Sequence, residues 1–347
     1  MKTILKQRSF IMGLAILWVA WFHTEVVTGN RIIDFLRQTG YGGVDLFFLL
    51  TGVGAWFSLS KKPGAADYMK RRMARILPSY FPFIMGWLIW VKFTGELYGT
   101  EIIGNLTMMG WWHGGRNQFN WYVSAIWLFY LLAPVFVGLI QREKKWNTVF
   151  LMAVTFVISI SFLHTNLLIA FSRLPLFVLG IGLGKFLMKS QQDKKQCENG
   201  DDKKNINEKK NVNEKSGKIL LIFNLLMLLG IVLLFVSVEF LSGYLWNYGL
   251  WWYPFILISV GLAADMGILA EALSKNKVLK WIKKIVDELG KNSFEIFLFH
   301  IPVFQHAIAH WEMNGIKWFL LFVLMMATGV IYGNMIRFIQ GMILKRK

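Results

Sequence analysis

The chain has 347 residues, of which 55% are hydrophobic and 16% aromatic, and its mean hydropathy is +0.47. Apolar runs of about 17 to 25 residues recur to the C-terminus, which predicts an all-α integral membrane protein and excludes an ordinary soluble domain. The formal net charge is +18, but the basic residues gather between the apolar runs. This placement argues for a membrane surface and against a nucleic-acid partner.

Successive apolar segments predict a bundle of about ten transmembrane helices. They cover residues 9–28, 43–60, 77–93, 121–140, 147–163, 167–188, 218–238, 243–264, 293–311 and 316–340. If the N-terminus is cytoplasmic, nearly all of the 38 lysines and arginines fall at the inner face. The exceptions are Arg31, Arg37, Lys92, Arg116, Arg173 and Lys317. The positive-inside rule therefore predicts that both termini are cytoplasmic.

Three ionisable residues share one depth in these segments. At about 1.5 Å per residue, His23 and Arg173 lie about 21 Å above the inner face, and Asp45 lies at about 26 Å. Because charged groups are costly in a bilayer, this coincidence favours a functional cluster. The alternative is that His23 only hydrogen-bonds a neighbouring helix. A histidine beside a carboxylate suits general-base chemistry on a hydroxyl, and a nearby arginine can stabilise developing negative charge.

Arginines precede the third segment. Arg71, Arg72 and Arg75 stand just before Ile76 and Pro78. Anchoring at the inner face explains their charge. The choice of arginine, in a chain that otherwise uses mostly lysine, favours bidentate binding of a phosphate-bearing ligand. Both interpretations stay open at this point.

The loops divide the chain. Residues 94–120 form the longest outer loop, which ends at Asn120 and is long enough to cover a site facing outward. Residues 189–217 are nearly devoid of apolar side chains, which predicts a disordered cytoplasmic linker. This linker would separate helices one to six, in residues 1–188, from helices seven to ten, in residues 218–347. Residues 270–291 combine lysines with an apolar stripe, which predicts an amphipathic helix attracted to anionic membrane lipids at the inner surface.

The remaining histidines and the cysteine carry weaker signals. His300 is seven residues into an ascending helix, about 10 Å up and nearer the cytoplasm than His23. His306 and His310 share a helix face, but two histidines without a third ligand do not predict a metal site. Cys197 is the only cysteine and lies in the polar linker, so no disulfide framework is predicted.

Taken in order, these motifs resemble the membrane acyltransferase-3 family. The matching segments are 13–17 with His23, 43–52, 71–78, 121–134, 173–180 and 293–302. The resemblance implies an enzyme with ten spans that moves an acetyl or other short acyl group from cytoplasmic acyl-coenzyme A to a hydroxyl. The acceptor would be a surface glycan, an envelope component or a small molecule. The implied location is the bacterial cytoplasmic membrane, with acetyl-coenzyme A the expected co-substrate and no permanently bound cofactor or metal.

The resemblance also assigns site residues. It makes His23 the catalytic histidine and links Arg71, Arg72 and Arg75 to the acyl-coenzyme A donor. The further site candidates are His300, Glu295 and Asn120. With the depth argument above, the predicted catalytic set is His23, Asp45 and Arg173.

One position departs from the family pattern. The family usually places Arg or Lys eleven residues before the histidine, where this chain has Met12. Arg8 lies one helical turn lower, about 60° around the helix, and is predicted to supply the missing cation by reaching upward. Arg8 therefore joins the predicted donor-binding residues.

Two other classes of protein fit the same residues. Intramembrane His, Asp and Arg also suit a proton-coupled transporter that exports an acylated metabolite or a lipid-linked sugar. A sensory or scaffold module without turnover is the third interpretation. The arginine cluster, together with the lack of the inverted repeat seen in many transporters, favours the enzyme.

Overall fold

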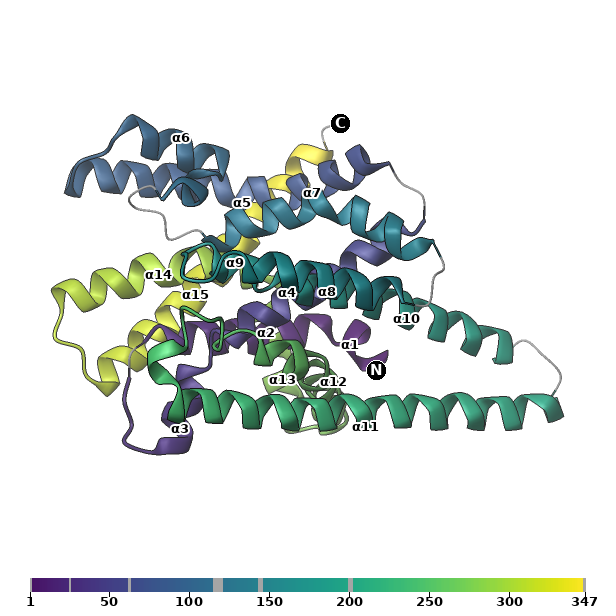
Figure 1. Ribbon diagram of the computed structural model, residues 1–347. Coiled ribbons are helices and arrows are strands. Elements are labelled where there is room, and N and C mark those ends of the chain that lie inside the picture. The colour runs from purple at the N-terminus through teal and green to yellow at the C-terminus, as the bar shows by residue number, and fades with distance from the viewer. Residues whose placement is uncertain are drawn as a thin grey trace. The chain divides into compact units, whose positions relative to one another are not determined.

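The computed structural model describes residues 2–24, 26–61, 64–114, 121–142, 146–198 and 202–345. Figure 1 traces the chain from the purple N-terminus to the yellow C-terminus. Every regular element in the described ranges is a helix, so the all-α fold class is confirmed.

The helices follow the apolar segments of the sequence. In chain order they are α1 (Lys2–Lys6), α2 (Arg8–Phe22), α3 (Arg31–Gln38), α4 (Gly42–Leu59), α5 (Ala65–Thr94), α6 (Gly99–Thr107), η1 (Gly110–His113), α7 (Trp121–Gln141), α8 (Asn147–Ile160), α9 (Leu168–Phe171), α10 (Leu174–Glu198), α11 (Asp202–Phe240), η2 (Ser242–Tyr244), α12 (Pro254–Lys275), α13 (Lys280–Lys291), α14 (Ser293–His310) and α15 (Gly315–Lys345).

Seven helices of the described chain are long and apolar enough to cross a membrane. They are Gly42–Leu59, Ala65–Thr94, Trp121–Gln141, Leu168–Asp193, Gly217–Phe240, Pro254–Lys275 and Gly315–Ile343. The shorter apolar helices Arg8–Phe22 and Asn147–Ile160, together with α14, occupy the other predicted segments. The protein is therefore a multi-pass membrane protein, while the total of ten spans and the cytoplasmic termini stay predictions.

Two predicted segments have different bounds in the structure. The eighth was predicted at 243–264, but α12 begins at Pro254, because proline is preorganised for the first turn of a helix and η2 and turns occupy the preceding residues. The third was predicted from 77, yet α5 starts at Ala65. The arginine cluster therefore lies on a helix rather than in a loop.

Two long helices run into the predicted linker. α10 continues to Glu198 and α11 begins at Asp202, so the described backbone of this segment is helical. Residues 199–201 and the side chain of Cys197 lie outside the described part. The division of the chain into two functional parts at 189–217 stays a prediction.

The structure separates into two compact units. The first comprises Met1–Ile11, Asp45–Ala65 and Leu132–Leu279, and the second comprises Met12–Val44, Ala66–Leu131 and Lys280–Lys347. The unit boundaries fall inside α2, α4 and α7, at the first residue of α5, and between α12 and α13. Each unit is built around its own helix packing, and each contains part of the predicted site.

Glycines allow close helix packing in the first unit. Gly52 of α4 faces the carbonyl oxygen of Phe177, and Gly180 of α10 faces that of Leu49, with no room for a Cβ atom at either position. Small residues let two backbones approach closely, which drives helix association where lipid gives no hydrophobic advantage. In the same unit, α11 and α12 lie side by side (Figure 1).

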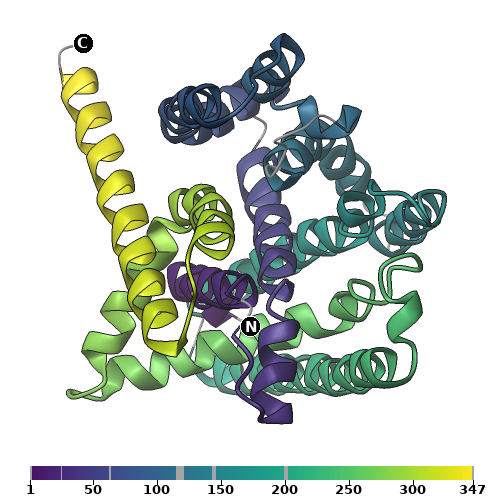
Figure 2. The same cartoon turned by 90° about the vertical axis from the view of Figure 1, so that its left-hand side faces the viewer.

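The second unit is organised around α14. Helix α14 packs along α15 (Figure 2), and Gly329 of α15 leaves no space for a Cβ atom beside Ile296. The hydroxyl of Tyr332 on α15 donates to the carbonyl oxygen of Ser79 on α5, at 2.7 Å. These contacts fix α14, which carries two of the candidate site residues, Glu295 and His300.

Candidate active site

His23 lies at the end of a helix rather than inside one. The sequence predicted a first span to residue 28, but α2 ends at Phe22. The exposed carbonyl groups of the helix end have partners: Thr24 Oγ1 donates to Trp21 O at 2.8 Å, and Arg37 Nη1 donates to Phe22 O at 3.4 Å. Because these donors satisfy the last turn, the chain can leave the helix at His23.

His23 contacts a second histidine in the same unit. The ring centroids of His23 and His300 are 5.0 Å apart, with an interplanar angle of 61°. Counting residues along straight helices predicted different depths for these two residues, and this was wrong. Helices in a bundle tilt and cross, so position along one helix does not give height in a membrane.

The tautomer of His300 is fixed by the backbone. Its Nδ1 lies 2.6 Å from the carbonyl oxygen of Phe297, and since a carbonyl oxygen only accepts, the proton must be on Nδ1. Nε2 then carries a lone pair. It is buried and has no hydrogen-bond partner within the described residues. A buried acceptor of this kind is a costly feature that a function usually explains.

Aromatic rings surround the two imidazoles. Phe22 meets His23 edge-on at 4.8 Å between centroids, and Phe297 lies 4.9 Å from His300 and 4.8 Å from Tyr122. His300 is completely buried, whereas His23 is half-buried. The two histidines therefore differ in environment: His23 is partly exposed, whereas His300 is enclosed by protein.

Glu295 joins the network that positions α14. Its Oε1 accepts a 2.6 Å hydrogen bond from Ser79 Oγ, and the backbone of Ser79 accepts from Tyr332. Glu295 and His300 are five residues apart and so point in directions about 140° apart around the helix. The structure makes Glu295 a link between α5, α14 and α15. Ser79 and Tyr332 were missed in the sequence, because nothing local marks a contact 253 residues apart.

Asp45 and Arg173 form an ion pair in the first unit. Arg173 Nε lies 3.3 Å from Asp45 Oδ1, and both side chains are at most 2% exposed. Arg173 Nη1 also donates to Ile169 O at 2.6 Å, and the guanidinium carbon lies 4.8 Å from the Trp252 ring centroid. The sequence therefore identified two residues that the fold brings together. The orientation of His23 by Asp45 stays a prediction.

Local structure explains where each member of this ion pair sits. Asp45 lies in the first turn of α4, where the helix dipole favours a negative charge. Arg173 lies between α9 and α10, where the chain leaves one helix and enters the next. Breaks in apolar helices free backbone groups that polar side chains must satisfy, which is what Arg173 does for Ile169.

The inner arginines differ in environment. Arg72 is half-buried, and its guanidinium lies 5.0 Å from the Tyr68 ring and 5.4 Å from the Tyr130 ring. Arg71 and Arg75 are exposed and, four residues apart, share one face of α5. Arg71 and Arg75 thus lie at the surface of the second unit, while Arg72 also packs on aromatic rings.

Arg8 and Asn120 are the remaining predicted site residues. Arg8 is the first residue of α2 and is half-buried, as is Met12. Asn120 lies outside the described residues. Among the described residues, no group of three or more His, Cys, Asp or Glu side chains could hold a metal ion.

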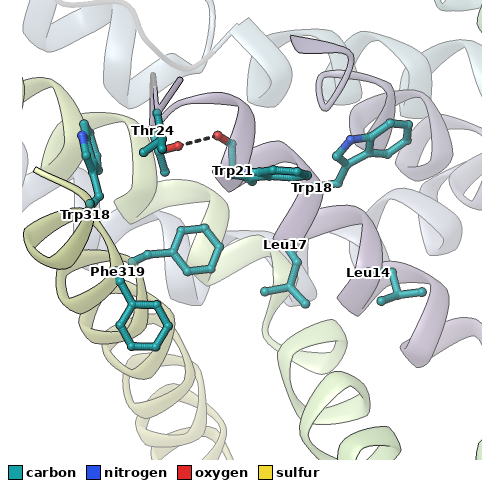
Figure 3. A pocket seen from close by; sticks show the side chains of 10 residues that line it. Leu14, Leu17, Trp18, Trp21, Thr24, Trp318 and Phe319 are labelled. Carbon is teal, nitrogen blue, oxygen red and sulfur yellow. Dashed lines mark hydrogen bonds between the residues drawn. The ribbon is translucent and has the colours of Figure 1, made fainter. Parts of the chain in front are cut away.

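An apolar groove of about 540 Å³ lies in the second unit beside α2 (Figure 3). Its lining consists of Leu14, Leu17, Trp18, Trp21, Thr24, Val26, Gly315, Trp318, Phe319 and Phe322. The first four recur at helical spacing on one face of α2, a periodicity that could have been read from the sequence. His23 is not among them, although the next residue, Thr24, is.

A second cavity, of about 470 Å³, is lined by residues of α5, α14 and α15 and by Trp311. It contains Trp87, Trp90, His306 and Tyr332 among its lining residues. Neither described cavity includes the His23–His300 pair, so the candidate active site is defined by its polar residues and not by cavity size.

Comparison with protein-family models places the chain in a family. Residues 11–333 match the family model described as an acyltransferase domain, which covers nearly the whole chain and includes both the histidine pair and the Asp45–Arg173 pair. Comparison with curated proteins and with solved structures gave no match. The extent of the family match shows that this chain belongs to the acyltransferase-3 family.

Proposed function

We propose that the protein is an O-acyltransferase of the bacterial cytoplasmic membrane. It would move an acetyl or other short acyl group from acyl-coenzyme A to a hydroxyl of a surface glycan, an envelope component or a small molecule. The observation that carries this proposal is the contact between His23 and His300. In His300, the Nδ1–H group donates to the carbonyl oxygen of Phe297. Family membership supports acyl transfer, and the histidine pair supplies a group able to take a proton from a hydroxyl.

His23 is the base in the proposed reaction. It takes the proton from the acceptor hydroxyl while the oxygen attacks the thioester carbonyl carbon. The carbon–sulfur bond then breaks, and the coenzyme A thiolate leaves with the proton that His23 had taken. The products are an ester and a thiol, so the two substrates supply every atom.

His300 stabilises the charge that forms on His23. Its unprotonated Nε2 offers a lone pair in a dry setting, where an electrostatic interaction is stronger than in water. Two imidazolium ions this close would repel each other, so only one ring of the pair is positively charged at a time. The half-buried position of His23 fits the member that meets substrate.

The donor would rest on the arginines of α5. Coenzyme A carries phosphates, and the exposed guanidinium groups of Arg71 and Arg75 suit bidentate binding of phosphate oxygens. Arg72, whose guanidinium lies near the rings of Tyr68 and Tyr130, adds positive charge at the same helix turn. Arg8, at the start of α2, is proposed as a further cation for the donor.

Thiol release tests the function directly. Purified protein in lipid nanodiscs should release free coenzyme A thiol from acetyl-coenzyme A when a hydroxyl-bearing acceptor extract is added. A transporter of an acylated metabolite or a lipid-linked sugar forms no bond and would release none. If the protein exported such a molecule and released no thiol, the transporter interpretation would replace the enzyme interpretation.

The donor assignment predicts a loss on replacing arginine by lysine. In the double variant Arg71→Lys and Arg75→Lys the charge is kept, and so is the membrane orientation, but the planar forks are lost. We expect acyl-coenzyme A to bind at least about tenfold more weakly, since losing even one hydrogen bond to a charged group costs about 1.5–3 kcal/mol. Binding is measured by titration of the purified protein. Arg142→Lys, at another exposed arginine, is the control and should bind normally. If the double variant bound acyl-coenzyme A as tightly as the wild type, both arginines would serve only to anchor the helix at the inner membrane face.

A further inference from the structure

Helix α13 presents a mixed basic and apolar surface. Lys280, Trp281, Lys284 and Ile285 are all exposed, with Trp281 at 58% and Ile285 at 51%. Because these residues stand at i, i+1, i+4 and i+5, they form one continuous face, which we call the α13 patch. Large exposed apolar side chains beside lysines on a short helix are typical of a membrane interface.

The opposite face of α13 is already used within the second unit. Val286 and Leu289 are buried, and Gly13 of α2 has no space for a Cβ atom beside the Val286 carbonyl. The apolar stripe that the sequence assigned to lipid is therefore divided. Part of it packs against protein, whereas Ile285 stays exposed with Trp281.

The acidic residues of α13 have partners inside the same unit. Lys283 Nζ lies 2.6 Å from Asp287 Oδ2, and Lys291 Nζ lies 3.0 Å from Glu288 Oε2. The hydrogen bond from Lys291 holds the pKa of Glu288 below its ordinary value, so this carboxylate stays charged and paired. By contrast, Lys280 and Lys284 have no ion pair among the described residues.

We infer that the α13 patch binds the anionic head groups of membrane phospholipids. Lys280 and Lys284 supply charge complementarity, and their long stems can follow the apolar surface while the ammonium groups reach phosphate oxygens. Trp281 enters the interface, where an indole ring is favoured, and Ile285 inserts beside it. The occupant is thus a membrane surface, not a soluble partner.

Lipid bound here would steady α14. Only Asn292 separates α13 from α14, and this residue is completely buried. Its Nδ2 donates to Glu288 O at 2.8 Å, and its Oδ1 accepts from Arg337 Nη2 at 2.7 Å. Because α13 joins α14 through this rigid residue, a lipid contact that holds α13 also holds the start of the helix that carries His300.

Hydrogen exchange tests the inference without relying on activity. The full-length protein is placed in nanodiscs of phosphatidylcholine alone or mixed with phosphatidylglycerol, and exchange of the amides of 280–291 is measured. A lysine near an anionic surface is worth about 1 kcal/mol, which is about fivefold in an equilibrium. We therefore expect at least about fivefold slower exchange with phosphatidylglycerol, and loss of that difference at high salt.

Variants identify the residues responsible. Lys280→Gln with Lys284→Gln should abolish the phosphatidylglycerol effect. Lys61→Gln with Lys70→Gln removes the same charge from exposed positions elsewhere and should keep it. Equal exchange of the wild-type protein in both lipids, or equal loss in both double variants, would overturn the inference. If the α13 variant does not fold, the wild-type comparison with its salt dependence still decides.

Discussion

Replacing His23 by alanine is expected to lower the rate of acyl transfer by about 10²- to 10⁴-fold, the usual loss when a general base is removed. The reason is that His23, the half-buried member of the histidine pair, is the base in the proposed mechanism. Expression and acyl-coenzyme A binding should stay near wild type, because its ring makes no hydrogen bond to the described residues. Thiol release gives the rate.

Two further variants sharpen this test. His310→Ala removes an exposed histidine of α14 and should leave transfer unchanged. His300→Ala should lower transfer less than His23→Ala, since it removes a stabilising neighbour and not the base itself. If His23→Ala retained transfer within a few fold of wild type, the histidine would be structural, and the proposed mechanism would lose its base.

Breaking the Asp45–Arg173 pair is expected to cause the largest loss of stability in the molecule. Replacing Arg173 by methionine leaves the Asp45 carboxylate buried without its partner, which typically costs about 3–5 kcal/mol in the free energy of unfolding. Unfolding of the detergent-solubilised protein by denaturant measures this. At the exposed pair Lys218–Glu214, Glu214→Ala is the control and should cost less than about 1 kcal/mol.

A double variant separates stability from chemistry at this pair. Asp45→Leu with Arg173→Met removes both charges, and apolar replacement of a buried ion pair is often neutral or stabilising. We expect the unfolding free energy to recover while transfer stays lost, because the predicted catalytic set includes both residues. A stable double variant with normal thiol release would show that the pair serves the fold alone.

The sequence determined the helices and singled out the polar residues that form the candidate site. Long apolar runs must form helices in a bilayer, since every backbone N–H and C=O group needs a partner within the segment. The same reasoning singled out His23, Asp45 and Arg173, because ionisable groups in apolar runs are costly. It also found the arginines of α5, although it placed them before the helix and not on it.

Only the tertiary structure decided which of these residues meet. His300 contacts His23 although helix counting placed it lower, because tilt and crossing set the height of a residue. Arg37 satisfies a carbonyl at the end of α2, and that helix ends six residues earlier than the predicted span. Contacts of this kind join residues far apart in the chain, and their geometry depends on packing that no local pattern contains.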